Sequence, residues 1–290
     1  MFIRLMKTRI TFFCAILAVI QMVLLYMQGP VWTTKVSIES CEDSRSLEGN
    51  TTKMTWQEYE MLFKTSILQT TYNCKVIEEI GSAIRKNGEG VHSTCMNNVY
   101  KPRVPCIVYA FGVGYIWHFE DEFAERGCQV FAFDPSMKTE SHKRSGNLWF
   151  YNIGLRSVDS DNFTPHVDSY VNKSQIFTWK VRTLKSIMEM LGHTNITIDV
   201  LKMDIEGYEF DVLTTMMDDG TIKHVRQLLG EWHIRGDQRF EFSIKYFVAK
   251  RLLSYGFKTF NYNVVGRHGQ CKKIYCLQAN LGFVNTKFRK

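Results

Sequence analysis

The chain has 290 residues, a hydrophobic fraction of 45% and a formal net charge of +7. This length accommodates one α/β domain with an extension, and the hydrophobic fraction excludes a chain that is disordered throughout. Arg4, Lys7 and Arg9 supply three of the positive charges, and the other basic residues are scattered without a basic–aromatic motif, so we expect no nucleic-acid partner.

The N-terminal residues predict a membrane anchor. Residues 10–27 form an apolar run without charge, and positive residues precede it. The run is close to the ~20 residues that cross a bilayer as a helix, and the preceding charges predict that residues 1–9 stay in the cytosol. We therefore expect a single-pass type II membrane protein with a signal anchor at 10–27, a lumenal stem at 28–55 and a domain at 56–290 that faces the ER or Golgi lumen. A cleaved signal peptide, which would make the protein secreted, is the alternative.

Two further features are typical of the secretory pathway. Acceptor tripeptides for N-glycosylation begin at Asn50, Asn162, Asn172 and Asn195, which predicts a glycoprotein. One of the eight cysteines lies in the expected anchor, and the other seven follow it. An oxidising lumen would pair them as disulfides and leave one over, with the pairing open.

Strands and helices alternate along most of the remaining chain. Apolar residues at helical spacing predict a helix that begins at Trp56. Buried strands are expected at 107–111, 129–133, 148–151, 197–203 and 228–234, and helices at 116–127, 183–191, 208–217 and 239–254. Two last strands, near 257–263 and 274–283, fit an antiparallel hairpin. This alternation is typical of a doubly wound, mostly parallel Rossmann-like sheet.

A glycine turn and an aspartate indicate a cofactor site. Gly112 and Gly114 follow the first core strand, where the lack of a Cβ lets a cofactor approach the backbone. Asp134 ends the next strand, where a carboxylate can accept hydrogen bonds from a ribose. A dinucleotide fingerprint would have a third glycine where Trp117 stands. This favours S-adenosylmethionine, which has no pyrophosphate, over NAD.

Titratable residues lie at the end of the fourth strand and on the fifth. Asp204 ends one strand, while Glu231 and His233 alternate onto one face of the next. We predict these three as catalytic candidates, with His233 as a base for a hydroxyl acceptor and with Asp204 and Glu231 as ligands for Mg²⁺ or Mn²⁺. The alternative is structural, with Glu206 and Glu209 complementing the dipole of the following helix.

Three segments carry a resemblance to a known family. Ala132-Phe133-Asp134-Pro135-Ser136, the run at 201–209 and Glu231-Trp232-His233 resemble FkbM-type proteins and the membrane-anchored proteins of the methyltransferase-like 24 type. The resemblance implies a class I methyltransferase domain at 56–290, with Gly112, Gly114 and Asp134 around S-adenosylmethionine and Asn152 near its adenine. Ala110 departs from the pattern, because such enzymes often carry an acid there.

We therefore expect an S-adenosylmethionine-dependent methyltransferase of the secretory pathway. Its acceptor would be a glycan, a lipid or a secreted protein, and no residue of the sequence indicates which of these it is. Two alternatives remain. One is a non-catalytic lumenal relative. The other is a Golgi glycosyltransferase, whose nucleotide-sugar site usually needs an Asp-x-Asp metal motif. Asp159-Ser160-Asp161 has this sequence, but we interpret the stretch as a solvated loop.

Overall fold

The computed structural model describes residues 55–81, 90–166, 178–236, 239–266 and 275–288. The chain divides into two units, residues 1–52 and 53–290, and all described residues belong to the second. The expected anchor at 10–27, and the stem apart from its last residue, lie outside the described residues. Within the described ranges, no helix is long and apolar enough to cross a membrane.

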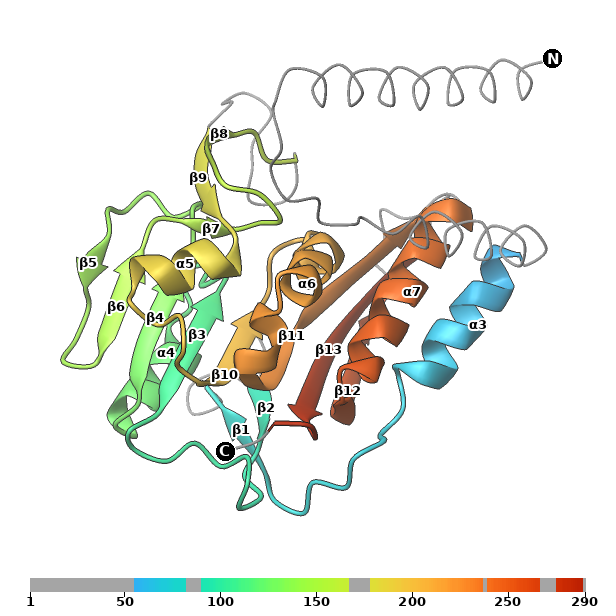
Figure 1. Cartoon of the computed structure of the whole chain (residues 1–290), viewed down its shortest axis with the longest axis horizontal. Helices are drawn as coiled ribbons and strands as arrows, with labels where there is room; N and C mark the ends of the chain where they lie inside the picture. The colour runs from blue at the N-terminus through green and yellow to red at the C-terminus, as the bar shows by residue number, and fades with distance from the viewer. Residues whose placement is uncertain (1–54, 82–89, 167–177, 237–238, 267–274, 289–290) are drawn as a thin grey trace, which may run out of the picture. The chain divides into compact units, whose positions relative to one another are not determined.

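One large sheet organises the described part of the chain, in the order β12–β13–β11–β10–β3–β4–β6–β5 (Figure 1). Its five central strands are parallel: β3 (Ile107–Phe111), β4 (Gln129–Phe133), β6 (Leu148–Tyr151), β10 (Ile198–Met203) and β11 (Val225–Gly236). At one end β12 (Phe257–Gly266) and β13 (Tyr275–Asn285) run antiparallel, and at the other end so does β5 (His142–Lys143). The predicted parallel sheet with a C-terminal antiparallel hairpin is confirmed.

Helices cover both faces of this sheet, which is why its central strands are mostly apolar on both faces. Alternate side chains of β3 divide between the faces: Tyr109 and Phe111 join one hydrophobic cluster, and Val108 and Ala110 join the other. The first cluster packs under α3 (Trp56–Ser66), α5 (Leu184–Met190), α6 (Glu209–Asp218) and α7 (Arg239–Ser254). The second packs under α4 (His118–Glu125) and the hairpin of β1 (Ile77–Ile80) and β2 (His92–Cys95). Figure 1 shows α4 behind the sheet and α5, α6 and α7 in front of it.

A small three-stranded sheet was not predicted. It contains β7 (Gly154–Leu155), β9 (Trp179–Arg182) and β8 (Ser160–Phe163), in that order. Asp159 and Asp161 are exposed, as expected, but only Asp159 lies in a loop, because Ser160 and Asp161 begin β8. Asp159 accepts hydrogen bonds from the Thr183 backbone N–H at 2.7 Å and from the Ser186 hydroxyl at 2.5 Å. Asp161 pairs with Arg182 at 2.6 Å, so the two carboxylates have separate structural partners.

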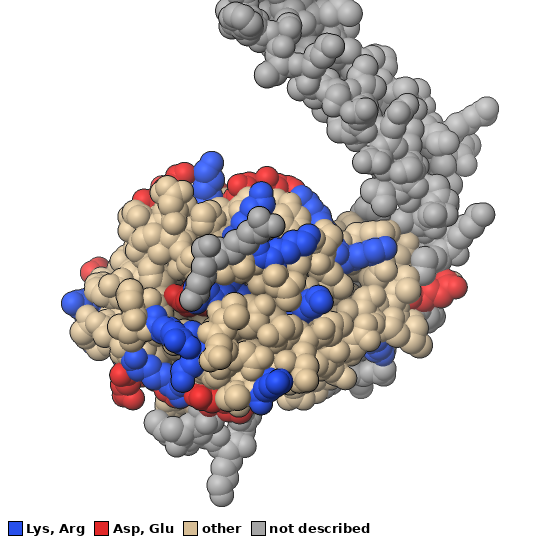
Figure 2. All heavy atoms as spheres, turned by 60° about the horizontal axis from the view of Figure 1, so that its bottom comes forward, with Lys and Arg blue, Asp and Glu red and all other residues tan. Residues whose placement is uncertain are grey.

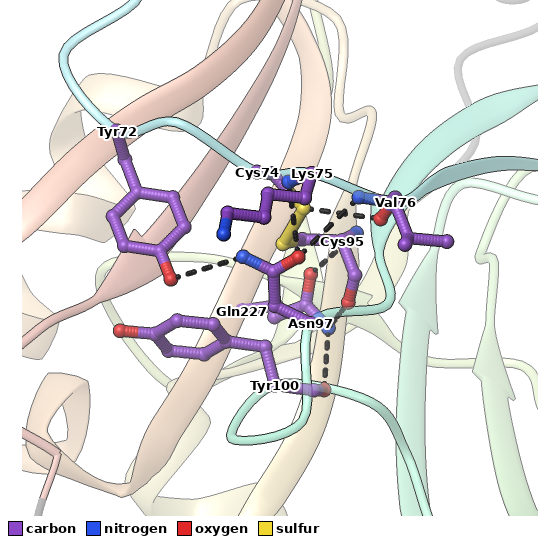
Figure 3. The surroundings of a disulfide bond; sticks show 8 residues. All are labelled: Tyr72, Cys74, Lys75, Val76, Cys95, Asn97, Tyr100 and Gln227. Atoms are coloured by element: carbon purple, nitrogen blue, oxygen red, sulfur yellow. Dashed lines mark hydrogen bonds between the residues drawn. A yellow bond between two sulfur atoms is a disulfide. The ribbon is translucent and has the colours of Figure 1, made fainter.

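Two disulfides confirm part of the cysteine prediction. Cys74 pairs with Cys95 and Cys106 with Cys128. Figure 3 shows that Gln227 of β11 reaches the first of these pairs. Its amide accepts a hydrogen bond from the Cys95 N–H at 2.9 Å and donates to the carbonyl of Cys95 at 3.1 Å. This buried amide fixes the β1–β2 hairpin to the large sheet.

Charged side chains are distributed over the surface in small groups. On the face in Figure 2, Lys and Arg side chains stand in several groups with uncharged surface between them. This agrees with the scattered basic residues of the sequence. The expectation of no nucleic-acid partner stays a prediction.

Candidate functional site

The glycine turn lies at the carboxyl end of β3, where sites form in open α/β sheets. Both Gly112 (φ 82°) and Gly114 (φ 56°) have positive φ. A Cβ on Gly112 would overlap the carbonyl oxygen of Asp204, so this glycine is required by the end of the neighbouring strand β10. A Cβ on Gly114 would meet no atom within 4 Å. Gly114 is therefore the residue of the turn that borders open space.

Asp134 follows β4 and holds the glycine turn. Its Oδ2 accepts hydrogen bonds from the N–H groups of Val113 and Gly114, both at 2.9 Å. Its Oδ1 accepts from the backbone N–H of Ser136 at 2.8 Å and from its hydroxyl at 2.6 Å. The four bonds occupy the lone-pair positions of the carboxylate, and the residue is only 4% exposed. The structure thus gives Asp134 a positioning role, and its predicted contact with a ribose stays a prediction.

Asn152 follows β6 at the same edge of the sheet. Its side-chain amide donates hydrogen bonds to the carbonyls of Met137 at 3.1 Å and Thr139 at 2.7 Å. The residue therefore holds the segment that follows Asp134. Its predicted place beside the adenine stays a prediction.

A buried ion pair behind the turn was missed from the sequence. The ammonium of Lys202 donates to the carbonyl of Gly112 at 2.8 Å and to Oε1 of Glu120 at 3.1 Å. Lys202 is 2% exposed and Glu120 is fully buried. Burial raises the pKa of Glu120, while the charge of Lys202 acts in the opposite direction. The signal was the single lysine inside the buried strand β10, because a buried lysine requires a partner.

The acidic residues gather differently from the prediction. One ligand atom each from Asp204, Glu206 and His233 lies within 4.8 Å of the other two. The Glu231 carboxylate instead hydrogen bonds with the amide of Gln278 on β13. The predicted ligand pair of Asp204 and Glu231 stays a prediction, and it is Glu206 that the structure groups with Asp204 and His233. Strand alternation cannot show that the antiparallel neighbour β13 supplies a partner for Glu231, nor that the turn after β10 brings Glu206 back towards β11.

Glu209 connects this cluster to the start of α6. Its Oε1 accepts from the N–H groups of Ile205 at 3.3 Å and Gly207 at 3.1 Å, and it lies 3.0 Å from Nδ1 of His233. The structural alternative is thus right for Glu209, which stabilises the turn before the helix. The other ring nitrogen of His233 lies 3.5 Å from Oε2 of Glu206.

The surroundings shift two pKa values. Burial raises the pKa of Asp204 to about 7, and the charge of Glu231 adds to this effect. Burial lowers the pKa of His233, but the hydrogen bond and charge of Glu209, with the charges of Asp204 and Glu206, outweigh burial and raise that pKa to about 9. The carboxylates around His233 thus favour its charged form, and its predicted role as a base stays a prediction.

Comparisons with known proteins agree with the fold. A family model described as "Methyltransferase domain" matches residues 32–277. Over 130 residues, the chain is 34% identical to probable methyltransferase-like protein 24 of Homo sapiens and 33% identical to that of Rattus norvegicus. These matches cover 44% of this chain but only 33% of the relatives, so the chain spans about a third of the length of the curated relatives that it matches.

Solved structures with a similar arrangement are distant. A protein of the NADB-Rossmann superfamily from Streptococcus agalactiae has a TM-score of 0.30 and 12% identity, with 63% of each chain covered. A 16S rRNA adenine methyltransferase variant from Catenulisporales acidiphilia has a TM-score of 0.32 and 11% identity, with 66% of this chain and 90% of that chain covered.

Proposed function

This chain belongs to the methyltransferase-domain family, and from that premise we propose that it is an S-adenosylmethionine-dependent methyltransferase. The observation that carries the proposal is the open space at Gly114, at the carboxyl end of β3 and next to the tip of β4. The bound cofactor would supply an electrophilic methyl group. The turn that binds the cofactor would consist of Gly112, Gly114 and Asp134. Asn152 would hold the segment that follows Asp134.

The chain's own residues prepare this turn for a ligand. Asp134 fixes the N–H groups of Val113 and Gly114 from one side, and Lys202 fixes the carbonyl of Gly112 from the other. A turn that is already ordered loses little conformational entropy when a ligand binds. Asp204 follows β10, while Glu231 and His233 lie on β11 beyond its last pair with β10, and we place the methyl acceptor beside them.

We extend the proposal to the secretory pathway. The apolar run at 10–27 supports a type II anchor, and the two disulfides support an oxidising compartment. The acceptor would then be a glycan, a lipid or a secreted protein.

Binding of S-adenosylmethionine to the purified full-length chain, measured by calorimetry, tests the cofactor assignment. The informative variant is Gly114→Asn, because asparagine tolerates a positive φ while its side chain would fill the open space. We expect it to weaken binding at least about tenfold, the effect of ~1.4 kcal/mol. Gly192→Asn is the matched control, since Gly192 also has a positive φ (72°) and no atom within 4 Å of a Cβ. Unlike Gly114, Gly192 lies between the end of α5 and the start of β10. Equal binding by both variants and the parent chain would remove Gly114 from the site.

A non-catalytic relative is the second candidate. Two observations favour it: all four hydrogen-bonding positions of the Asp134 carboxylate are occupied by the chain itself, and Ala110 is fully buried in the core. The same titration separates the candidates, because a non-catalytic relative would bind no S-adenosylmethionine. A parallel titration with a UDP-sugar addresses the glycosyltransferase alternative, which no described contact favours.

A further inference from the structure

Three side chains converge where β11 extends beyond the end of its neighbour β10. The last paired residues of these strands are Met203 and Gly230. Asp204 and Glu206 follow the end of β10, and His233 lies on the extension of β11. From this juxtaposition, with one ligand atom of each within 4.8 Å of the others, we infer that Asp204, Glu206 and His233 bind a divalent cation.

The hydrogen bond between Glu209 and His233 gives the imidazole the orientation of a metal ligand. Glu209 Oε1 accepts hydrogen bonds from two backbone N–H groups. Because an ionised carboxylate can only accept, the contact of 3.0 Å between this oxygen and Nδ1 of His233 makes Nδ1 the donor. This leaves Nε2 on the side of Glu206, at 3.5 Å from its Oε2. In metal-binding histidines, the N–H of the second ring nitrogen characteristically donates a hydrogen bond to a carboxylate in this way.

Asp204 provides an independent observation. Its Oδ1 is buried and has no hydrogen-bond partner among the residues that the structure describes. A buried acceptor without a partner is costly, so such atoms are uncommon in folded proteins. The surroundings also hold an excess of negative charge, because the carboxylates of Asp204, Glu206 and Glu209 surround one imidazole. A bound dication would satisfy the oxygen and balance the charge.

The donor set indicates the kind of ion. Carboxylates suit Mg²⁺ and Mn²⁺, whereas imidazole suits first-row transition metals. One imidazole with two carboxylates therefore points to a transition-metal dication of the Mn²⁺ type. The role of the ion rests on the proposed function: it would bind the acceptor oxygen and lower the pKa of the acceptor hydroxyl.

Titration of the full-length chain with MnCl₂, followed by the electron paramagnetic resonance signal of free Mn²⁺, tests the site. We expect one Mn²⁺ per chain, with a dissociation constant of about 1 mM or tighter. Asp204→Asn and Glu206→Gln should each weaken binding at least about tenfold. Glu189→Gln, the same kind of change on the exposed surface of α5, is the control and should bind as the parent chain does.

Absence of stoichiometric Mn²⁺ binding would overturn the inference, and so would binding that both site variants leave unchanged. Circular dichroism checks that each variant is folded. If the more buried Asp204→Asn does not fold, Glu206→Gln decides, because the Glu206 side chain is 27% exposed and its loss disturbs the core little. Binding of S-adenosylmethionine is measured on the same samples. Mn²⁺ binding without cofactor binding would support the metal site and overturn the proposed function.

Discussion

At the scale of single residues, two carboxylates hold the backbone of the site by accepting hydrogen bonds from the chain's own N–H and hydroxyl groups. Asp134 accepts four hydrogen bonds from Val113, Gly114 and Ser136, and Glu209 accepts two from the turn before α6. Such charge-assisted bonds are stronger than neutral ones. The backbone of both turns is therefore fixed before any ligand arrives.

Asp134→Asn tests the positioning role of this carboxylate. An amide presents one oxygen and one NH₂ group, so two of the four donors would lose their acceptor. We expect the free energy of unfolding to fall by about 1–3 kcal/mol, measured by urea denaturation. Asp211→Asn, the same change at an exposed position of α6, is the control. An unchanged urea midpoint for Asp134→Asn would contradict the role.

His92 should make stability depend on pH. Burial lowers the pKa of His92 to about 3, and the charge of Lys202 adds to this effect. The unfolded chain takes up a proton below its ordinary pKa of 6.5, whereas the folded chain does so only near 3. The contribution is therefore complete above pH 6.5 and is lost as the pH falls, at about 1.4 kcal/mol per unit.

The variant His92→Phe isolates this contribution, because it keeps an aromatic ring against Phe119 but cannot be protonated. Urea midpoints measured between pH 4 and 6.5 should fall less steeply for the variant than for the parent chain. Parallel curves would show that His92 is not buried as a neutral ring.

At the scale of elements, the ion pair of Lys202 and Glu120 joins β10 to α4 and also holds the glycine turn of β3. Breaking a buried pair leaves an uncompensated charge, which costs more than the pair contributes. Lys202→Met should lower the free energy of unfolding by about 3–5 kcal/mol.

The double variant Lys202→Met/Glu120→Leu removes both charges and should recover much of this loss. Urea denaturation of the two single variants and the double variant gives the coupling energy. Additive effects would mean that the two side chains do not interact.

Except for the two-residue β5, the strands of the large sheet could be predicted from their apolar runs, and the first two of these runs are followed by Gly112 and by Asp134-Pro135. Residues 107–111 and 129–133 are strands with the predicted bounds, and α7 spans the predicted 239–254. The strands of the small sheet have only two to four residues and no apolar repeat, so no pattern indicates them. The approach of Glu206 to His233 depends on a turn with positive φ at Glu206 (58°), a conformation that glutamate rarely adopts.

At the scale of the whole molecule, the Cys74–Cys95 disulfide lies within the region before the core strands, and the Cys106–Cys128 disulfide joins the starts of two core strands. Cys106 precedes β3, and Cys128 precedes β4, so this bond closes a segment with a sequence separation of 22. Loop-closure entropy then predicts a contribution of about 3 kcal/mol. Cys106→Ala/Cys128→Ala should lower the unfolding free energy by that amount in non-reducing urea titrations, and equal stability with and without the bond would contradict this.

Glycosylation tests the topology of the whole chain. Asn162 and Asn195 are both exposed at the surface of the domain, so both are accessible to the glycosylation machinery if the domain lies in the lumen. We expect treatment of the full-length protein from mammalian cells with an N-glycosidase to increase its electrophoretic mobility. Asn162→Gln and Asn195→Gln should each remove one step of that change, because each deletes one acceptor. Mobility that is unaffected by the enzyme in the folded parent chain would contradict the proposed lumenal domain.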